Sequence, residues 1–362
     1  MLVKKIKLEN FRNYEGLELE FSPEINYIYG NNGQGKTNIV EAVYMFASLK
    51  SHRVNHDFEM IKDGCEFARL EMDFENKDRD FNASIVLSKN QNRKIRVNDI
   101  KTARNSDLIG KFNAVLFSPE DFSVIKEGPS ERRRFTDIAI SQIKPNYFNC
   151  LLKYKEIIKQ KNLILKDTSG FSAMLDIYNE NLAEVAADII YYRYKFYKFI
   201  SENVGLLHKQ VTLTKDKFEI IYEPCVPYTD RKNVKKEILK KLERIREKEM
   251  LERTSIFGPH REDVSFFING KKIKEYASQG QQRTAILILK LAQAEYIKEK
   301  VGEYPVLLLD DILSELDADR RRYFLSEIRN KQVIITSTDK GSFGRRKDTK
   351  LIHIDNAKVS DI

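Results

Sequence analysis

The sequence lacks the features of a membrane protein and of a disulfide-stabilised protein. No apolar run is long enough to span a bilayer, and no apolar stretch follows the first lysines, so we predict neither a transmembrane helix nor a signal peptide. Cysteine is scarce: Cys65, Cys150 and Cys225 lie far apart and form no CxxC pair. We therefore expect reduced thiols in a cytoplasmic protein, rather than a disulfide framework or a zinc site.

Internal repeats, low-complexity linkers and extended heptad runs are also missing. The 362 residues are 41% hydrophobic and 32% charged, which is a globular composition with material for a sizeable core. The formal net charge of +9 is what a protein that binds a polyanion would carry. Because many lysine-rich proteins are basic without such a partner, charge alone leaves nucleic-acid binding open.

The two ends of the chain have the pattern of an α/β domain, whereas the middle is helical. Short strands are predicted at residues 2–8, 17–21, 25–29, 306–309 and 333–336. Helical spacing extends from 130 to 207, and a charged amphipathic helix, too short for a coiled coil, is predicted over 231–253. We therefore predict an α/β head from residues 1–118 and 255–362, a mostly helical inserted domain over 119–254, and no long coiled coil.

Residues 30–37 match the phosphate-binding loop pattern GxxxxGK[ST] at every defined position. Glycines let backbone N–H groups surround phosphate oxygens, and the start of the following helix adds a favourable dipole. Lys36 is expected to bridge the β- and γ-phosphates of ATP, and the Thr37 hydroxyl to bind Mg²⁺. The predicted ATP-binding residues of this loop are Gly30, Asn31, Asn32, Gly33, Gln34, Gly35, Lys36 and Thr37.

A second motif follows the apolar strand at 306–309. Asp310 comes directly after four apolar residues, as the magnesium-binding aspartate of a Walker B strand does. Asp311 occupies the next position, where a carboxylate can orient the water that attacks the γ-phosphate. Standing alone, the segment could also be a buried strand with two solvated acids at its end. Together with the P-loop it predicts a Mg²⁺–ATP site in which Lys36 and Asp311 are catalytic.

Two further segments complete an ordered set of ATPase motifs. Residues 278–281, Ser-Gln-Gly-Gln, resemble the core of the ABC signature, and Ser278, Gly280 and Gln281 would form a second phosphate-binding surface. By itself this segment could be a plain helix cap. Residues 314–317, Ser-Glu-Leu-Asp, match a D-loop. P-loop, signature, Walker B and D-loop thus occur in the order of ABC-type ATPases.

These residues resemble the ABC-type ATPases of chromosome maintenance, the SMC proteins and their relatives in DNA repair. Within that group the sequence is most similar to the bacterial recombination mediators. The matching segments are NFRNY at 10–14, KSHR at 50–53, SPED at 118–121, GPSERRRF at 128–135 and GPHRED at 258–263. The resemblance extends from Met1 to Thr338 and does not include the last two dozen residues.

The resemblance implies an ATP-dependent DNA-binding protein that acts at single-strand/double-strand junctions of gapped DNA. It implies an ATP-dependent homodimer that helps to load the RecA recombinase together with RecO and RecR. Asp311 stands where many ABC-type ATPases have a catalytic glutamate, which implies slow hydrolysis. Thr336 lies in the segment where many have a switch histidine, and Glu120 or Asp121 takes the place of the usual Q-loop glutamine.

Two other classes share parts of this pattern. The nucleotide-binding subunit of a membrane transporter would need a transmembrane partner and a glutamate after Asp310. A metabolic P-loop kinase has no reason to carry the signature segment or the D-loop.

Several residues have a second interpretation. Arg132, Arg133 and Arg134 could contact phosphate or form a solvated basic face. His52 and His56 could share a helical face as zinc ligands, but no further ligands accompany them. Tyrosines 191, 192, 194 and 197 alternate with basic residues, which suits stacking on single-stranded DNA, although tyrosines at helical spacing are more often part of a core.

Overall fold

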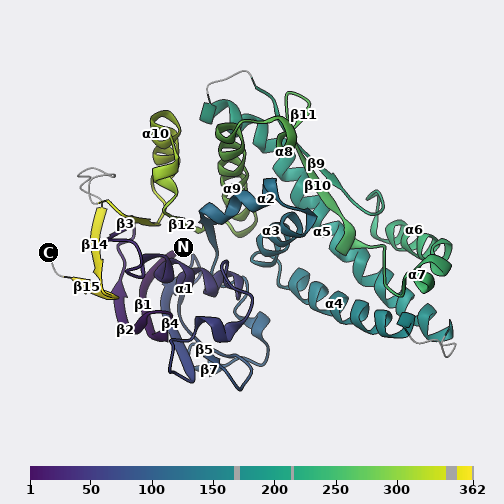
Figure 1. Ribbon diagram of the computed structural model, residues 1–362, viewed down its shortest axis with the longest axis horizontal. Coiled ribbons are helices and arrows are strands. Elements are labelled where there is room, and N and C mark those ends of the chain that lie inside the picture. The colour runs from purple at the N-terminus through teal and green to yellow at the C-terminus, as the bar shows by residue number, and fades with distance from the viewer. Residues whose placement is uncertain (167–171, 213–215, 340–348, 361–362) are drawn as a thin grey trace. The chain divides into compact units, whose positions relative to one another are not determined.

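The computed structural model describes residues 1–166, 172–212, 216–339 and 349–360 (Figure 1). The chain forms two compact units. The head unit contains Met1–Phe122, Leu206–Lys215 and Arg283–Ile362, and the insert unit contains Ser123–Gly205 and Asp216–Gln282. The first division lies close to the predicted boundary at 119, whereas the last lies at 283 rather than at 255.

Strand pairing explains the later boundary. In the insert unit β9 (Phe218–Glu223) pairs antiparallel with β10 (Asp263–Ile268), so that Phe218 lies opposite Ile268. The Asn269-Gly270 turn then leads into β11 (Lys271–Lys272), and the chain continues as the short helix α8 (Ile273–Tyr276), which contacts β10. Residues 255–282 therefore belong to the insert unit, because their hydrogen bonds and apolar contacts are made there. Strand β9 was not predicted from the sequence.

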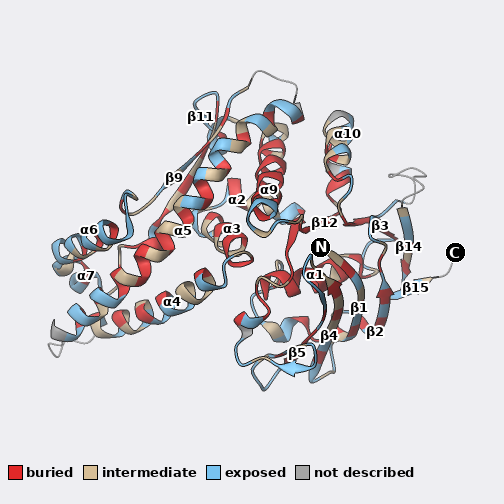
Figure 2. Cartoon of the chain, turned by 180° about the vertical axis from the view of Figure 1, so that it is seen from behind, coloured by how far each residue is buried: buried red, intermediate tan, exposed pale blue. Residues whose placement is uncertain are grey.

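One sheet of the head unit is antiparallel. Its strands are, in spatial order, β2 (Tyr14–Glu20), β1 (Leu2–Phe11), β4 (Phe67–Glu75), β5 (Asp80–Ser88), β6 (Lys94–Val97) and β7 (Ile100–Lys101). Buried and exposed residues alternate along β2 and β4, as expected for strands with one solvated face (Figure 2).

The other sheet of the head unit is mostly parallel and carries the predicted nucleotide motifs. Its order is β15 (Lys358–Ser360), β14 (Thr349–Asp355), β3 (Ile25–Tyr29), β13 (Val333–Ser337), β12 (Val306–Asp310) and β8 (Ala114–Phe117). Every residue of β3, β12 and β13 is buried, as is typical of parallel strands covered on both faces. Helix α1 (Lys36–Ser48) packs against β8, β12 and β13. The carboxyl ends of β3 and β12 therefore lie at the same edge of the sheet.

Helices dominate the insert unit. They include α2 (Ser123–Lys126), α3 (Pro129–Ser141), α4 (Pro145–Lys166), α5 (Ser172–Thr212), α6 (Arg231–Arg244) and α7 (Arg246–Glu252). The end of α5, from Leu206 onward, belongs to the head unit. The predicted helix over 231–253 is interrupted at Ile245, and the described residues contain no long coiled coil. Helix α9 (Gln279–Val301) begins in the insert unit and continues in the head unit, which also contains α10 (Ala318–Glu327). In the described ranges, no helix combines the length and apolarity needed to cross a membrane.

Candidate nucleotide-binding site

The P-loop connects β3 to α1, as its sequence predicts. Helix α1 begins at Lys36, and the preceding Gly35 has φ 110°, a backbone conformation that side chains rarely adopt. A Cβ at Gly35 would lie 2.7 Å from the Tyr14 hydroxyl, and a Cβ at Gly30 would overlap the carbonyl oxygen of Ile354. These glycines are therefore required by close neighbours as well as by the turn itself.

Lys36 is the buried cation of this loop. Its Nζ donates hydrogen bonds to the carbonyl oxygens of Gly30 at 2.7 Å and Asn31 at 2.8 Å. Burial lowers the pKa of Lys36, while the charges of Asp311 and Asp310 act in the opposite direction. Because an ammonium bonds more strongly to an anionic phosphate oxygen than to a neutral carbonyl oxygen, a phosphate oxygen could replace either carbonyl.

Thr37 and Asp310 are brought together from the two Walker motifs. The Thr37 Oγ1 donates to Asp310 Oδ1 at 2.8 Å, and Thr336 Oγ1 donates to the same oxygen at 2.7 Å. Burial raises the pKa of Asp310, and the hydrogen bonds from Thr336 and Thr37 oppose that shift. Hydroxyl and carboxylate oxygens are the ligands that Mg²⁺ prefers, so the residues present fit the predicted metal site.

Asp311 lies in the turn that follows β12. Its φ of 52° is left-handed, and its backbone N–H donates to Thr336 Oγ1 at 3.0 Å. Ser314 Oγ donates to the Asp311 carbonyl oxygen at 2.8 Å. Thr336 thus contacts both the Asp310 side chain and the Asp311 backbone. This role of Thr336 is not predictable from the sequence, where Thr336 is noted only in place of a switch histidine, because the contact depends on the pairing of β12 with β13.

The two candidate Q-loop residues, Glu120 and Asp121, lie in the turn after β8 and have different environments. Asp121 forms an ion pair with Lys290 in the protein interior, with its Oδ1 2.6 Å from Lys290 Nζ. Burial raises the pKa of Asp121, and Lys290 opposes that shift. Glu120 is exposed, and its charge contributes to the raised pKa of Asp310. Glu120 is therefore the carboxylate of this turn that is available to the site.

Glu41 of α1 joins two segments that were recognised only as sequence similarities. Its carboxylate accepts two hydrogen bonds from Arg12 at 2.8 and 2.6 Å, one from Ser51, and lies 3.7 Å from Arg53. Burial alone would raise the pKa of Glu41, but Arg12 and Ser51 hold it below its usual value. The NFRNY and KSHR segments are thus positioned by one buried carboxylate behind the P-loop. The ring of His52 packs edge-on against Tyr44.

The C-terminal strands, which lie outside the sequence resemblance, form one side of the site. Strand β14 pairs in parallel with β3, and the His353 ring stacks on Tyr29 with a centroid separation of 5.0 Å. The backbone N–H of Asn356 donates to the Gln34 side chain at 2.5 Å. Asn32 and Gly33 are exposed. The tail therefore holds one end of the P-loop and leaves its tip accessible.

The signature segment lies at the start of α9. Ser278 Oγ accepts a hydrogen bond from the Gln281 N–H at 3.3 Å, and Gln281 Oε1 accepts one from the Ser278 N–H at 3.0 Å. This reciprocal pair is a capping box, so the alternative role as a helix cap is realised. Ser278 is nevertheless exposed and Gly280 half-buried, which leaves both reachable from solvent. Their role as a phosphate-binding surface stays a prediction.

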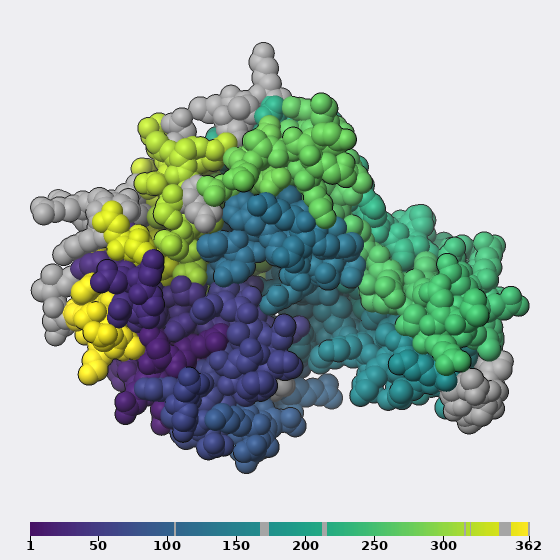
Figure 3. Space-filling model, viewed as in Figure 1, coloured from purple at the N-terminus to yellow at the C-terminus, as the bar shows by residue number. Residues whose placement is uncertain are grey.

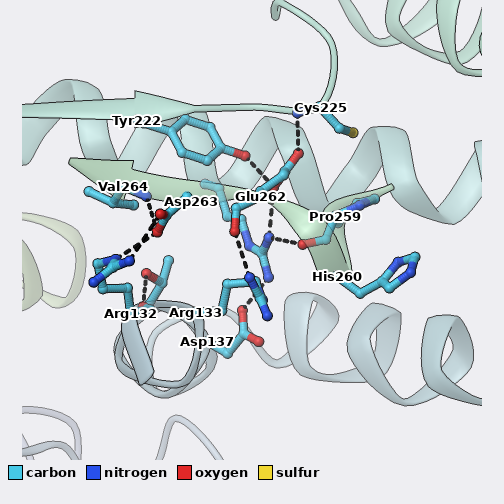
Figure 4. Close-up of polar contacts among 12 residues, drawn as sticks. Arg132, Arg133, Asp137, Tyr222, Cys225, Pro259, His260, Glu262, Asp263 and Val264 are labelled. Carbon is cyan, nitrogen blue, oxygen red and sulfur yellow. Dashed lines mark hydrogen bonds and ion pairs between the residues drawn. The ribbon is translucent and has the colours of Figure 1, made fainter. Parts of the chain in front are cut away.

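In the insert unit, an ion pair and a hydrogen bond to the backbone join the GPSERRRF segment to the GPHRED segment (Figure 4). Arg132 is buried and binds both oxygens of Asp263 at 2.6 and 2.9 Å, while Arg133 donates to the Glu262 carbonyl at 2.7 Å. Glu262 also accepts from Tyr222 and from the Cys225 N–H. Arg132 and Arg133 therefore position the GPHRED segment, and neither belongs to a solvated basic face.

The parallel sheet, the P-loop and the carboxylates at the end of β12 define an ABC-type P-loop ATPase head. The pattern of the family described as "RecF/RecN/SMC N terminal domain" matches residues 2–360. "DNA replication and repair protein RecF" of Clostridium perfringens is 41% identical over 338 residues, which cover 93% of each chain. The RecF of Lachnoclostridium phytofermentans is 42% identical over 341 residues, again covering 93% of each chain. The chain belongs to the RecF family.

Solved structures support the same assignment. A structure described as the recombination mediator protein RecF with ATP, in the RecFOR pathway, has a TM-score of 0.92 and 33% identity, covering 99% of this chain and 97% of that one. An SMC head bound to a winged-helix domain of ScpA has a TM-score of 0.57 at 16% identity, covering 99% and 98%, and supports the fold alone. The predicted fold class and the predicted family are thus confirmed.

Proposed function

We propose that the chain binds and slowly hydrolyses Mg²⁺–ATP and uses the ATP-bound state to bind DNA during recombinational repair. The observation that carries this proposal is the hydrogen bond between Thr37 and Asp310, which joins the P-loop to the Walker B strand. The ATP complex of a RecF with 33% identity supports the same ligand here.

Each residue of the site has a separate task in this proposal. Lys36 leaves the carbonyl groups that it now contacts and binds the β- and γ-phosphates. Thr37 and Asp310 hold Mg²⁺, which neutralises phosphate charge when bound. Asp311 orients the attacking water. Aspartate is one methylene shorter than the glutamate that is usual here, so its carboxylate reaches the water less well and hydrolysis is slow.

ATP is proposed to act chiefly as a switch for dimerisation. Ser278, Gly280 and Gln281 would contact the γ-phosphate bound by a second copy of the chain, giving a two-fold assembly with two nucleotides at the interface. The exposure of Ser278 supports this role. A ligand that makes contacts only in the paired state shifts the monomer–dimer equilibrium towards the dimer.

The partner of the ATP-bound dimer is proposed to be single-stranded and gapped DNA, including its single-strand/double-strand junctions. A net charge of +9 supports contact with backbone phosphates, which carry no sequence information. The relative described as a recombination mediator in the RecFOR pathway supports a role beside RecO and RecR in loading RecA.

DNA binding measured by fluorescence anisotropy tests the proposal. Single-stranded, duplex and gapped DNA would be titrated with the chain in the presence of ATP, ADP or no nucleotide. We expect ATP to strengthen binding, base sequence to matter little, and affinity to fall steeply with salt because bound lysines and arginines release counterions. Lys36→Ala is the matched control for the nucleotide effect. Equal affinity with and without ATP, or an affinity insensitive to salt, would contradict the proposal.

A further inference from the structure

Four tyrosine rings of the insert unit form a contiguous row. Tyr191, Tyr192 and Tyr194 come from α5, and Tyr228 comes from the segment between β9 and α6. Ring centroids are 5.3 Å apart for Tyr191–Tyr192, 5.7 Å for Tyr191–Tyr228 and 4.6 Å for Tyr194–Tyr228, the last pair being stacked. All four side chains are half-buried, so each ring retains exposed area. Tyr197, in contrast, is buried and hydrogen-bonded to Thr136, and is part of the core.

Basic side chains flank this row on α5. The Lys195 ammonium lies 5.8 Å from the centroid of the Tyr191 ring, a cation–π contact. Lys198 is exposed and follows Tyr194 and Lys195 by one helical turn. Because residues three and four apart share a helical face, Tyr191, Tyr194, Lys195 and Lys198 lie along one side of α5.

Helix α6 extends the basic character of the surface from Tyr228 onward. Its 14 residues, RKNVKKEILKKLER, include only two acidic side chains among many lysines and arginines. The acidic groups that face it from α5 are already neutralised: Arg231 pairs with Glu184 and Asp188, and Lys235 pairs with Glu184 and Glu180. These pairs hold α6 against α5.

The remaining cations of α6 are available to a ligand. Lys232, Lys236 and Lys241 are exposed, and none takes part in the ion pairs of the described residues. In the space-filling view the green segment that contains α6 lies on the surface of the insert unit (Figure 3). The surface therefore combines exposed aromatic faces with uncompensated positive charge.

We propose that the tyrosine row, together with α6, binds single-stranded DNA. Unpaired bases stack on the exposed faces of Tyr191, Tyr194 and Tyr228, and the phosphates between them contact lysines of α6. Stacking tolerates any base because every base has a π-face, and duplex DNA cannot use it because its bases already stack on one another. The inference rests on the proposed DNA-binding function and adds to it the site at which a single strand is distinguished from a duplex. An acidic peptide would need the lysines but not the row of rings.

Paired substitutions separate stacking from a merely structural role. Tyr191→Ala/Tyr228→Ala removes two rings of the row, whereas Tyr191→Phe/Tyr228→Phe retains the ring faces. Tyr178→Ala is the matched control, because Tyr178 is a half-buried tyrosine on the same helix outside the row. The full-length proteins would be titrated against a fluorescent thymidine oligonucleotide and against a duplex of equal length. We expect the double alanine variant to lose about 30-fold or more in affinity for the single strand, since each stacked base contributes about 1–3 kcal/mol, and the phenylalanine variant and the control to bind as the unsubstituted chain does.

A spectroscopic readout reports the stacking directly. The chain contains no tryptophan, so Tyr228→Trp introduces a single indole into the row. Bases that stack on this indole should quench its emission, and the quenching should follow the anisotropy titration. A duplex should leave the emission unchanged. Replacing Lys232 and Lys236 by glutamine should lower the salt slope of single-strand binding by about 0.7 for each phosphate that is no longer neutralised.

The outcomes distinguish this site from the proposed function on which it rests. If the unsubstituted chain binds no DNA, both fail. If it binds DNA and Tyr191→Ala/Tyr228→Ala binds the single strand equally well, the tyrosine site alone is overturned. Equal losses for single strand and duplex also overturn it, because they indicate charge contacts without stacking. Loss of affinity for an acidic peptide but not for DNA would identify the surface as a protein-binding site and would reject the proposal.

Discussion

The hydroxyl of Thr37 donates a 2.8 Å hydrogen bond to the carboxylate of Asp310, although 273 positions separate the two residues in the chain. Thr336 donates to the same carboxylate oxygen and accepts a hydrogen bond from the backbone of Asp311. The proposed metal ligands and the proposed water-orienting residue therefore form one connected group. A change at any of them is expected to affect the chemistry of the site before it affects the fold.

Lys36→Ala should weaken ATP binding by about 10- to 100-fold, the loss expected when a charged hydrogen-bonding partner is removed. Lys36→Arg should retain the fold but impair hydrolysis, because a planar guanidinium cannot replace a compact ammonium within the loop. Calorimetric ATP titration and phosphate release measure the two effects. Unchanged hydrolysis in both variants would be incompatible with the P-loop assignment.

Asp311→Asn should reduce hydrolysis by about 100-fold or more while ATP still binds, because an amide cannot accept a proton from the attacking water. The variant should accumulate in its ATP-bound state and bind DNA more tightly. Single-turnover hydrolysis and DNA anisotropy would be measured on the same preparation. A normal hydrolysis rate would show that Asp311 is structural and that another group, such as the exposed Glu120, activates the water.

Gly30→Ala should weaken ATP binding and lower the melting temperature, because the added Cβ would overlap the Ile354 carbonyl of β14. Forcing the loop to shift is expected to cost about 1–3 kcal/mol. Gly16→Ala is the control, since nothing lies within 4 Å of a Cβ built there. Thermal denaturation with and without ATP tests the prediction. If Gly30→Ala matched Gly16→Ala, β14 would not constrain the P-loop.

Ser278→Arg tests the signature in the dimer. The variant should bind ATP through the P-loop but remain monomeric, hydrolyse slowly and lose the stimulation of DNA binding by ATP, because a bulky cation would occupy the proposed interface. Light scattering with and without ATP measures the association state. Ser278→Thr preserves the hydroxyl and the helix cap and serves as the control. A normal ATP-dependent dimer in Ser278→Arg would remove the signature from the mechanism.

Glu262→Gln should destabilise the insert unit by about 1–3 kcal/mol, because it removes one of the two carboxylates that pair with the buried Arg193, while Asp137 remains 2.9 Å from the guanidinium. The Arg193 Nη1 lies 2.7 Å from Glu262 Oε2, and both side chains are nearly inaccessible. Glu219→Gln, in an exposed pair with Lys217, should cost about 1 kcal/mol or less. Calorimetric unfolding distinguishes the two. Equal stability of both variants would show that the network around Glu262 contributes little.

The nucleotide motifs were predictable because each is a short continuous segment whose spacing matches its local structure. Glycines at fixed intervals before Lys36 predict the P-loop, and an uninterrupted apolar run predicts the buried strand that ends at Asp310. The order of these motifs was sufficient to indicate an ABC-type head formed by both ends of the chain.

The sequence alone also indicated that the insert is mostly helical, but it did not indicate which segments of the insert pair with one another. Helical spacing predicted α4 and α5, whereas β9 has no distinctive turn signal and exists because β10 is available to pair with it. The boundary predicted at residue 255 differs from the division at 283 for the same reason. The row that Tyr228 forms with Tyr191 and Tyr194 likewise depends on a contact between segments distant in the chain.

Only the tertiary structure decided which groups complete the site. Thr336 reaches Asp310 because β13 lies between β3 and β12, and Ile354 approaches Gly30 because β14 adds to the other side of β3. Asp121 is withdrawn from the site by Lys290, which leaves Glu120 exposed. Strand order in a parallel sheet is set by packing among segments far apart in sequence. It therefore cannot be predicted from local residue spacing.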